Sequence, residues 1–445
     1  MTRPSPRVSI ITATYNRSNV LRYAIESALW QTFPDFEMLV IGDGCTDDSA
    51  EVVASFGDSR LHWQNLAQNS GNQSLPNNAG LEIARGKFIA YLGHDDIWLP
   101  HHLEILLQKL ETTGADLAYS WLEMIEPPET GFRTISGITS FGDFEPDAPI
   151  PPTSLMHTAA LWREIGPWKD YRTITLPTDQ EFVTRAFDRG KRIVSVKHLS
   201  ALKFSSTSRP NCYVEKPCHE QAEYVRHIKS ECDFLATELT AVIESIMLRH
   251  PEEIPRVSVS GMRPGEIVTQ SRVLRGLEKP AFPAPPVGPI DLSSSKAGPF
   301  LAQGWSAPEA GFRWTNGKTA TLLFGLSKPP PRVLQLELAP FIVSGKLPEQ
   351  TIQLRLNDEE IGRWSLTEKG VVNQTIALPQ SLLREENRLD FGLPNASSPR
   401  ELRLSLDIRR LALKVHWLQF VFADELATEP APNGASNTDF SETLR

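Results

Sequence analysis

The chain has 445 residues, of which 40% are hydrophobic and 22% charged, and its formal net charge is −9. This length exceeds what one compact core usually holds, so we expect two domains. The composition is that of an ordinary globular protein. Acidic residues prevail and are interspersed with basic ones, which argues against a nucleic-acid partner, because nucleic-acid phosphates need a basic surface.

Neither the cysteines nor the amino terminus indicate a secreted or membrane-spanning protein. The four cysteines are too few and too unevenly spaced for a disulfide framework, and no CxxC pair completes a zinc site. The segment MTRPSPR leads straight into an apolar strand without the hydrophobic core of a signal peptide. No stretch approaches the ~18 uncharged apolar residues of a spanning helix. We therefore predict a cytoplasmic protein that contacts a membrane, if at all, only peripherally.

The first half of the chain alternates short apolar runs with helical patterns. Residues 8–13, 37–42 and 87–92 are predicted strands, and residues 20–29 and 76–84 are predicted helices. Near-continuous apolar strands separated by helices are typical of a parallel sheet covered on both faces. The polar clusters TYNR, DGCTDD and GHDD follow the three strands in that order. Ligands of such sheets bind at the carboxyl ends of the strands, so we expect the site there.

The second half changes character. Residues 219–249 have the pattern of one long amphipathic helix that completes an α/β domain over residues 1–250, and residues 251–289 are proline-rich, as in a linker. Short alternating segments such as TATLLFGL, VLQLELA, TIQLRL and LRLSLDI then predict an all-β sandwich over residues 290–423. Residues 424–445 are polar and are expected to be a disordered tail.

The first two polar clusters suit the binding of a nucleotide base. Tyr15 lies just beyond the first strand, where its ring can stack on a pyrimidine, and Asp43 on the neighbouring loop can accept a hydrogen bond from a base N–H. The alternative for Asp43 is that it forms only a tight turn with Gly44.

The third cluster suits a diphosphate. A carboxylate at a strand end can hold Mg²⁺ or Mn²⁺, which prefer oxygen ligands and can bridge departing phosphates. Asp95 and Asp96 both qualify, although either could instead cap the helix expected near Pro100. We expect Asp95 to be the ligand and Asp96 to support the loop.

Asp179, in LPTDQEFVTRAF, lies at the start of an amphipathic helix. A carboxylate there can take the proton of an acceptor hydroxyl as general base. The alternative is an N-cap, and one sequence does not decide between the two.

The order of these blocks is more specific than any one of them. The string VSIITATYNR, FEMLVIGDGCTDDSAEVV, NNAGLEIARGKFIAYLGHDDIWLP and TDQEFVTRAFDRGKRI resembles glycosyltransferase family 2 over roughly residues 6–200. The resemblance implies a GT-A fold, a UDP-sugar or related nucleotide-sugar donor, and single displacement with inversion. By position it assigns metal binding to Asp95 and the base to Asp179. The donor-binding candidates are Thr14, Tyr15, Arg17, Asp43 and Asp96.

Two positions depart from the family pattern. The family commonly has an acidic residue where Gly93 opens GHDD, and a paired Asp where Gly42 precedes Asp43. A contact to the ribose or the metal shell is therefore expected to be missing, with His94 as a partial substitute or a solvated loop residue.

Further along, KFSSTSRPNCYVEKPCHEQ is polar and partly basic. Many GT-A enzymes close a loop from this region over the donor. The resemblance then implies that Arg209 meets the diphosphate and that His219 is a further metal ligand. The alternative for His219 is a polar residue in the first turn of a helix.

The sandwich looks like modules appended to bacterial sugar-active enzymes. Trp305 and Trp314 could be stacking platforms for a sugar ring or packing residues of the sandwich. The whole sequence predicts a metal-dependent inverting glycosyltransferase that builds a surface polysaccharide or glycoconjugate, with a glycan or glycolipid acceptor. The alternatives are a degenerate transferase that binds glycans and a sugar nucleotidyltransferase, although TATYNRSN is not the glycine-rich phosphate loop that the latter needs.

Overall fold

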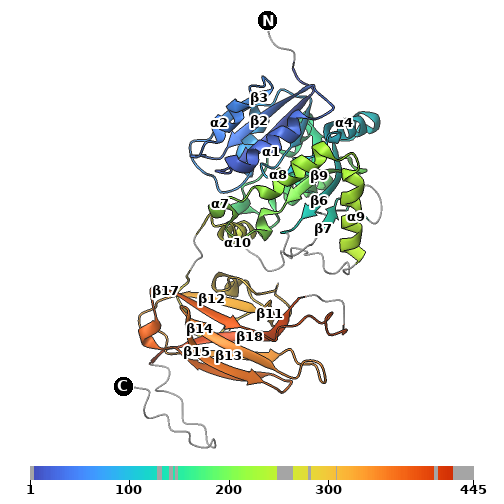
Figure 1. Ribbon diagram of the computed structural model, residues 1–445. Helices are drawn as coiled ribbons and strands as arrows, with labels where there is room; N and C mark the ends of the chain where they lie inside the picture. Colours follow the sequence, from blue (N-terminus) through green and yellow to red (C-terminus); the bar gives the residue numbers. More distant parts are fainter. Residues whose placement is uncertain are drawn as a thin grey trace, which may run out of the picture. The chain divides into compact units, whose positions relative to one another are not determined.

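The computed structural model describes residues 5–127, 133–139, 144–145, 149–247, 264–278, 282–306, 308–404 and 409–423. The chain forms two compact units, Met1–Lys279 and Pro280–Arg445 (Figure 1). The predicted tail over residues 424–445 lies outside the described residues. Within the described part, no helix combines the length and the apolar character that crossing a membrane requires.

The first unit is built on one mixed sheet in the order β3-β2-β1-β4-β8-β6-β9-β5, with β7 paired to β6. Strands β3, β2, β1 and β4 are mutually parallel, as predicted, whereas β8 runs antiparallel to both β4 and β6. The strands are β1 Val8–Thr14, β2 Phe36–Gly42, β3 Leu61–Asn65, β4 Phe88–Tyr91, β5 Ile97–Trp98, β6 Leu117–Ile125, β7 Arg133–Ser136, β8 Leu155–Thr158 and β9 Ile193–Phe204.

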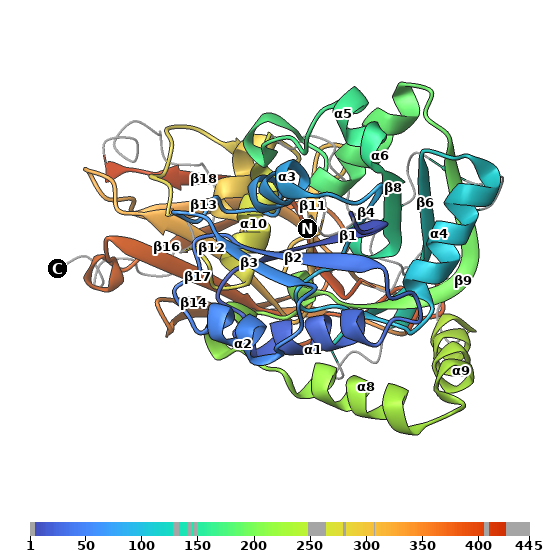
Figure 2. The ribbon, with the colours of Figure 1, turned by 90° about the horizontal axis from the view of Figure 1, so that it is seen from above.

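Helices cover both faces of this sheet (Figure 2). Successive residues of a strand point to opposite sides, so an apolar strand needs packing partners on both faces. Ile10 of β1 packs with Leu21 of α1 and Leu106 of α4, whereas Ile11 packs with Leu81 of α3 and Phe182 of α6. The helices are α1 Ser18–Leu29, α2 Ser49–Ser55, α3 Ser74–Ile83, α4 His102–Thr113, α5 Ala159–Ile165, α6 Thr178–Asp188, α7 Cys212–Glu215, α8 His219–Ser230, α9 Phe234–Met247 and α10 Glu266–Leu274.

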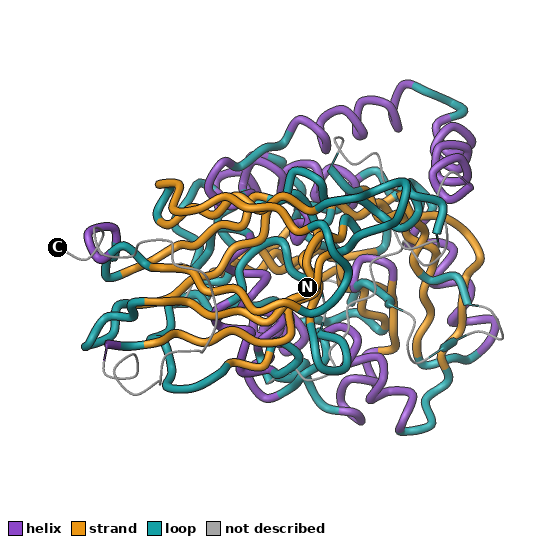
Figure 3. Tube along the Cα trace, turned by 90° about the horizontal axis from the view of Figure 1, so that it is seen from below, coloured by secondary structure: helices purple, strands orange, loops and turns teal. Residues whose placement is uncertain are grey.

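The single long helix expected over residues 219–249 is wrong. The structure has α8 and α9 as two helices, which run in different directions (Figure 3). Glu231 ends α8 in an extended conformation, with φ −113° and ψ 114°. The break lets Val225 and Phe234 enter the same small core with Phe204 of β9. Tertiary packing therefore overrides a helical pattern that continues through the break.

The range expected as a linker, residues 251–289, contains helix α10. This helix packs within the first unit: Gly265 N–H donates to the carbonyl of Ile174 at 3.0 Å, and Arg272 Nη1 donates to the carbonyl of Gly71 at 2.7 Å. Residues 251–263 lie outside the described part of the chain. The proline content of this range concealed an element that belongs to the first unit.

The second unit is a sandwich of two antiparallel sheets, ordered β10-β18-β13-β16, with β11 paired to β18, and β12-β17-β14-β15. Alternate residues of β13 and β14, such as Leu336 and Leu354, fill the core between the sheets. The strands are β10 Ile290–Asp291, β11 Arg313–Asn316, β12 Thr319–Gly325, β13 Val333–Pro340, β14 Gln350–Leu356, β15 Glu359–Leu366, β16 Val372–Ala377, β17 Glu386–Gly392 and β18 Leu411–Val421.

Two expectations for the sandwich change. The segment LRLSLDI is not a strand where it is described: residues 402–404 form turns, and residues 405–408 lie outside the described part. Trp305 is a packing residue, since it lies against the sandwich core and its indole N–H donates to the carbonyl of Thr321 at 2.9 Å. Trp314 packs against Phe312 and Phe341 instead.

Candidate functional site

Asp43, the first residue after β2, holds the segment of residues 69–71 in place. Its carboxylate accepts hydrogen bonds from Ser70 N–H at 2.9 and 3.0 Å, from Gly71 N–H at 3.3 Å and from Asn69 Nδ2 at 2.9 Å. Burial raises the pKa of Asp43, while these hydrogen bonds oppose the rise. Gly44, with φ +71°, has no room for a side chain against the same segment. The tight-turn alternative therefore describes part of what Asp43 does.

Arg17 lies between β1 and α1, beyond the carboxyl end of the strand that pairs with β2. It is only 3% exposed, yet its Nε and Nη1 atoms have no hydrogen-bond partner among the described residues. Its guanidinium lies 5.1 Å from the ring centroid of Tyr213. A buried cation with free donors is costly unless a ligand satisfies it. Thr14 Oγ1 is also buried without a described partner, and the Tyr15 side chain is half-buried.

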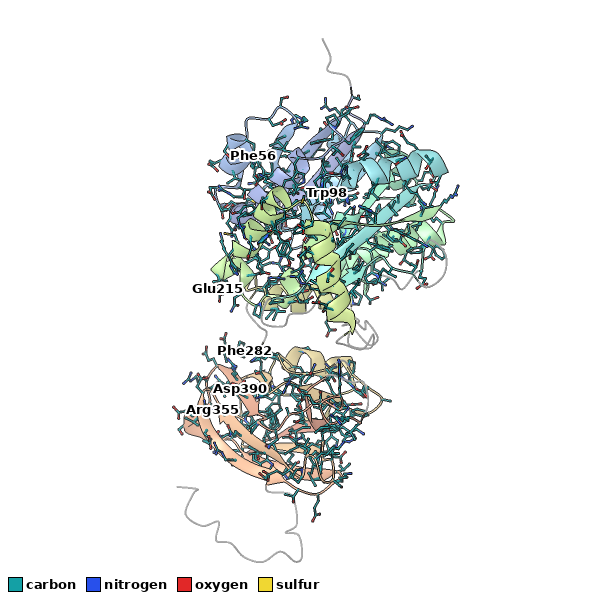
Figure 4. All side chains as sticks on the ribbon, turned by 45° about the vertical axis from the view of Figure 1, so that its right-hand side comes forward. Phe56, Trp98, Glu215, Phe282, Arg355 and Asp390 are labelled. Atoms are coloured by element: carbon teal, nitrogen blue, oxygen red, sulfur yellow. The ribbon has the colours of Figure 1, made fainter. Side chains whose placement is uncertain are left out.

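Asp95 and Asp96 have different surroundings. Asp96 is fully buried and accepts from Thr153 Oγ1, from Phe204 N–H at 3.3 Å and from Lys203 Nζ at 3.4 Å. Its burial raises its pKa to about 6. Thr153 in turn is anchored by Trp98, which Figure 4 labels within the first unit and whose indole N–H donates to the Thr153 carbonyl at 2.7 Å.

Asp95 faces a small pocket instead. Neither aspartate caps α4, whose N-cap residue is His101. Burial raises the pKa of Asp95, but the nearby His94, Lys203 and Arg17 outweigh it and hold that pKa below its usual value. The carboxylate is therefore ionised. The pocket is lined by Arg17, Asp95, Phe204, Ser206, Arg209, Cys212, Pro217, Glu220 and Gln221.

Both departures from the family pattern have a steric cause. A Cβ atom at Gly93 would lie 2.5 Å from Asp96 Oδ2, and one at Gly42 would lie 2.4 Å from Asn65 Oδ1 and 2.7 Å from Trp63. Neighbouring side chains thus occupy the space that acidic residues would take. The contact that an acidic residue would make at either position stays a predicted absence, since glycine supplies no carboxylate there.

Arg209 lines the pocket, but its charge is already paired. Its Nε and Nη2 atoms donate to the two carboxylate oxygens of Glu220 at 2.8 and 2.6 Å, and Nη1 donates to the carbonyls of Ile125 and Ser205. His219, the first residue of α8, is exposed and does not line the pocket. The structure does not bring His219 to Asp95, and the first-turn alternative fits it better.

In the parts of the chain that are described, no group of three or more His, Cys, Asp or Glu side chains could hold a metal ion. Mg²⁺ usually binds through one or two carboxylates together with substrate phosphates, and Mn²⁺ also suits carboxylate oxygens. One ionised carboxylate in a pocket beside a free guanidinium fits that manner of binding. Asp95 is the side chain that would hold the ion.

Asp179 is the second residue of α6 and not its N-cap, which is Pro177 without a side-chain cap. Its half-buried carboxyl has a pKa raised by burial, against which the charge of Lys203 acts. Lys203 also lies close to Asp95 and Asp96. The helix therefore presents Asp179 near the same cluster of charges as the GHDD loop.

Three further residues, which were not singled out in the sequence, join the site. Tyr213 of α7 lies between Arg17 and Arg275, whose guanidinium is 5.4 Å from its ring, and its hydroxyl is 3.3 Å from His94 Nε2. Lys203 ends β9. Tyr213 and Arg275 come from segments expected to be loop and linker, so only the folded chain brings them to the motifs.

Known glycosyltransferases are similar to the first part of this chain. The family described as "Glycosyl transferase family 2" matches residues 9–164. "Uncharacterized glycosyltransferase RP339" of Rickettsia prowazekii (strain Madrid E) is 34% identical over 162 residues, which are 35% of this chain and 50% of the relative. "Putative teichuronic acid biosynthesis glycosyltransferase TuaG" of Bacillus subtilis (strain 168) is 34% identical over 110 residues, 24% of this chain and 43% of the relative.

This chain therefore spans about half the length of the curated relatives it matches. Among solved structures, residues 1–349 of Staphylococcus aureus TarS in complex with UDP-GlcNAc have a TM-score of 0.41 at 17% identity. That alignment covers 61% of this chain and 88% of the other.

Proposed function

We propose, from the premise that residues 9–164 belong to glycosyl transferase family 2, that this protein moves a sugar from a nucleotide diphosphate to an acceptor hydroxyl with inversion. The observation that carries the proposal is the pocket shared by Asp95 and Arg17. There, an ionised carboxylate lies beside a buried guanidinium with unused N–H donors. The family resemblance favours a UDP-sugar as the donor.

A diphosphate satisfies both groups at once. Its oxygens accept hydrogen bonds from the free Nε and Nη1 of Arg17, and charge-assisted bonds of this kind are the stronger ones. Asp95 would hold Mg²⁺ or Mn²⁺ against the same phosphates, and that ion, when bound, neutralises charge on the leaving group. Tyr15 would meet the base, and Asp43 would act there by holding the loop of residues 69–71 in place.

Asp179 is the proposed general base. As the acceptor oxygen attacks the anomeric carbon, its proton passes to the Asp179 carboxylate, and the bond from the anomeric carbon to the nucleotide diphosphate breaks. Burial raises the pKa of Asp179, which makes its carboxylate a stronger base than an exposed one. One displacement at the anomeric carbon inverts its configuration.

The acceptor class is proposed from the relatives. TuaG carries the description of a teichuronic acid biosynthesis enzyme, which favours a polysaccharide or glycoconjugate acceptor for this chain. The glycan-binding alternative rests on the Gly93 departure, and it predicts that no nucleotide sugar stabilises the protein. A cytoplasmic location stays a prediction from the sequence.

Donor binding tests the proposal directly. Thermal unfolding of the full chain is measured with a panel of nucleotide sugars, with and without Mn²⁺, because a bound donor stabilises the native state in proportion to its occupancy. We expect stabilisation by one donor in the presence of Mn²⁺. Arg17→Met and Asp95→Asn should each weaken it at least tenfold in apparent affinity. Arg22→Met, which changes an exposed arginine on the same helix, is the matched control. Equal donor affinity of Arg17→Met and the parent would reject the pocket.

A further inference from the structure

Lys203 brings a positive charge into the carboxylate cluster, and the proposed reaction does not use it. Its Nζ atom lies 3.4 Å from Asp96 Oδ2, and 27% of its side chain is exposed. Burial lowers the pKa of Lys203, but Asp96, Asp95 and Asp179 together outweigh burial and raise it above its usual value. The charged ammonium group therefore contacts Asp96 and lies close enough to Asp95 and Asp179 for their charges to act on it.

The backbone fixes this lysine in place. Lys203 lies opposite Met124 in the parallel pairing of β6 with β9, and the preceding Leu202 lies opposite Ile97 of β5. The next residue, Phe204, donates its N–H to Asp96 Oδ1 at 3.3 Å. Two consecutive residues of β9 thus bind the two oxygens of one carboxylate. The backbone that carries the ammonium group therefore belongs to the sheet and not to a loop, and the contact with Asp96 holds the ammonium group itself.

We propose that Lys203 is a positioning residue that acts as the resident cation of the site. It holds the carboxylates of Asp95, Asp96 and Asp179 together before any donor binds, and it repels a divalent cation from Asp95. The metal ion then enters together with the donor diphosphate. The inference rests on the proposed function for the roles of Asp95 and Asp179, but it concerns the donor-free protein.

The charges in the site support this order of binding. Lys203 acts on all three carboxylates, and Arg17 and the Glu220-paired Arg209 also act on Asp95, so positive charge largely balances the carboxylates before Mg²⁺ or Mn²⁺ binds. Charges at such separations interact strongly in a partly buried site. A diphosphate adds negative charge and oxygen ligands together, which is the way such ions usually bind. Removing the lysine charge should therefore allow the metal ion to bind at Asp95 without the donor.

The test measures Mn²⁺ binding to the donor-free full chain by electron paramagnetic resonance of the free ion. We expect Lys203→Met to bind Mn²⁺ about tenfold more tightly than the parent, and Lys203→Arg, which keeps the charge, to bind like the parent. Adding Asp95→Asn to Lys203→Met should remove the gain. Addition of UDP should raise the affinity of the parent and narrow the difference from Lys203→Met.

Equal Mn²⁺ affinity of folded Lys203→Met and the parent would overturn the inference. If Lys203→Met fails to fold, Lys203→Gln replaces it, since glutamine keeps a hydrogen-bond donor near Asp96 without the charge. A gain in Lys203→Met combined with no effect of UDP on the parent would support the role of Lys203 and count against the nucleotide diphosphate donor. The two proposals therefore fail by different results.

Discussion

Asp43 follows β2 and Asp95 lies beyond β4, on either side of β1 in the same sheet. Asp43 accepts hydrogen bonds from two backbone N–H groups and one side-chain amide, all from residues 69–71. His94 Nε2 lies 4.0 Å from Asp95 Oδ2, and the Asp95 carboxylate lines a pocket. One carboxylate shapes a loop, whereas the other is available to a ligand.

The same contrast divides the neighbours Asp95 and Asp96. The Asp96 carboxylate accepts hydrogen bonds from Thr153, Lys203 and Phe204, and it occupies the space beside Gly93. A buried carboxylate with all its hydrogen bonds made contributes to the structure, and one with few of them made contributes to chemistry. A sequence motif does not distinguish these two kinds of carboxylate. The predictions below test whether this difference between satisfied and open carboxylates holds.

The largest effect is expected at Asp179, the open carboxylate on α6. Asp179→Asn should lower turnover by roughly 10²–10⁴-fold, the usual range for losing a general base. Donor affinity should stay close to that of the parent, because the base acts on the acceptor. Steady-state kinetics with a donor and acceptor pair measure the first quantity, and thermal shift with donor alone measures the second.

The matched control is Asp188→Asn, at the exposed carboxyl end of the same helix. It should keep parental turnover. If Asp179→Asn and Asp188→Asn behaved alike, Asp179 would have no part in proton transfer, and burial would be its only distinction.

The second effect concerns the loop that Asp43 holds. Arg272 of α10 donates to the Gly71 carbonyl, so α10 supports that loop from the other side. A fragment ending at residue 279 should retain donor binding. A fragment ending at residue 255 lacks α10 and Arg275 and should bind donor at least tenfold more weakly. Donor titrations of the two fragments decide the matter, and equal affinities would show that the Asp43 loop stands without α10.

The truncation also shows where sequence reasoning succeeded and failed. The strands at residues 8–13, 37–42 and 87–92 were predictable because short apolar runs bounded by polar residues are typical of buried strands. The roles of α10 and Tyr213 were not, since their helical turns carry no motif and their partners are distant in sequence. The break between α8 and α9 was equally hidden, because amphipathic spacing continues on both sides of Glu231.

Site residues divide in the same way. The polar clusters after the strands brought Arg17 and Asp95 to attention, and a position at a helix start brought Asp179. The structure places Arg17 and Asp95 in one pocket and Lys203 close to Asp95 and Asp179. Arg209 and His219 were predicted from the family resemblance, in which a polar loop of this region closes over the donor. Whether a charge is free depends on its partners, and Glu220 takes that of Arg209. No sequence pattern records that pairing.

The third effect is on stability. Gly93→Ala places a Cβ atom 2.5 Å from the buried carboxylate of Asp96, and backbone shifts of this kind cost about 1–3 kcal/mol. Chemical denaturation should show that loss. Gly362→Ala, where the added atom makes only ordinary contact with Trp364 at 3.6 Å, is the control for a tolerated substitution. A stable Gly93→Ala would mean that Asp96 is not held as tightly as its three partners indicate.

The smallest effect is a shift in pH dependence, and it separates the two kinds of carboxylate in one experiment. Burial raises the pKa of Asp179 above the ordinary aspartate value of about 3.9. A general base works only when deprotonated. Turnover should therefore be at its maximum above this raised pKa and should fall as the pH drops through it. The acidic limb of the kcat profile should therefore lie above about pH 4. Asp43→Asn should alter the donor KM and leave that limb in place, because Asp43 serves the loop and not the proton transfer. If Asp43→Asn shifted the acidic limb of the kcat profile, the titrating group would be Asp43 and not Asp179. The distinction between a structural and a catalytic carboxylate would then be wrong.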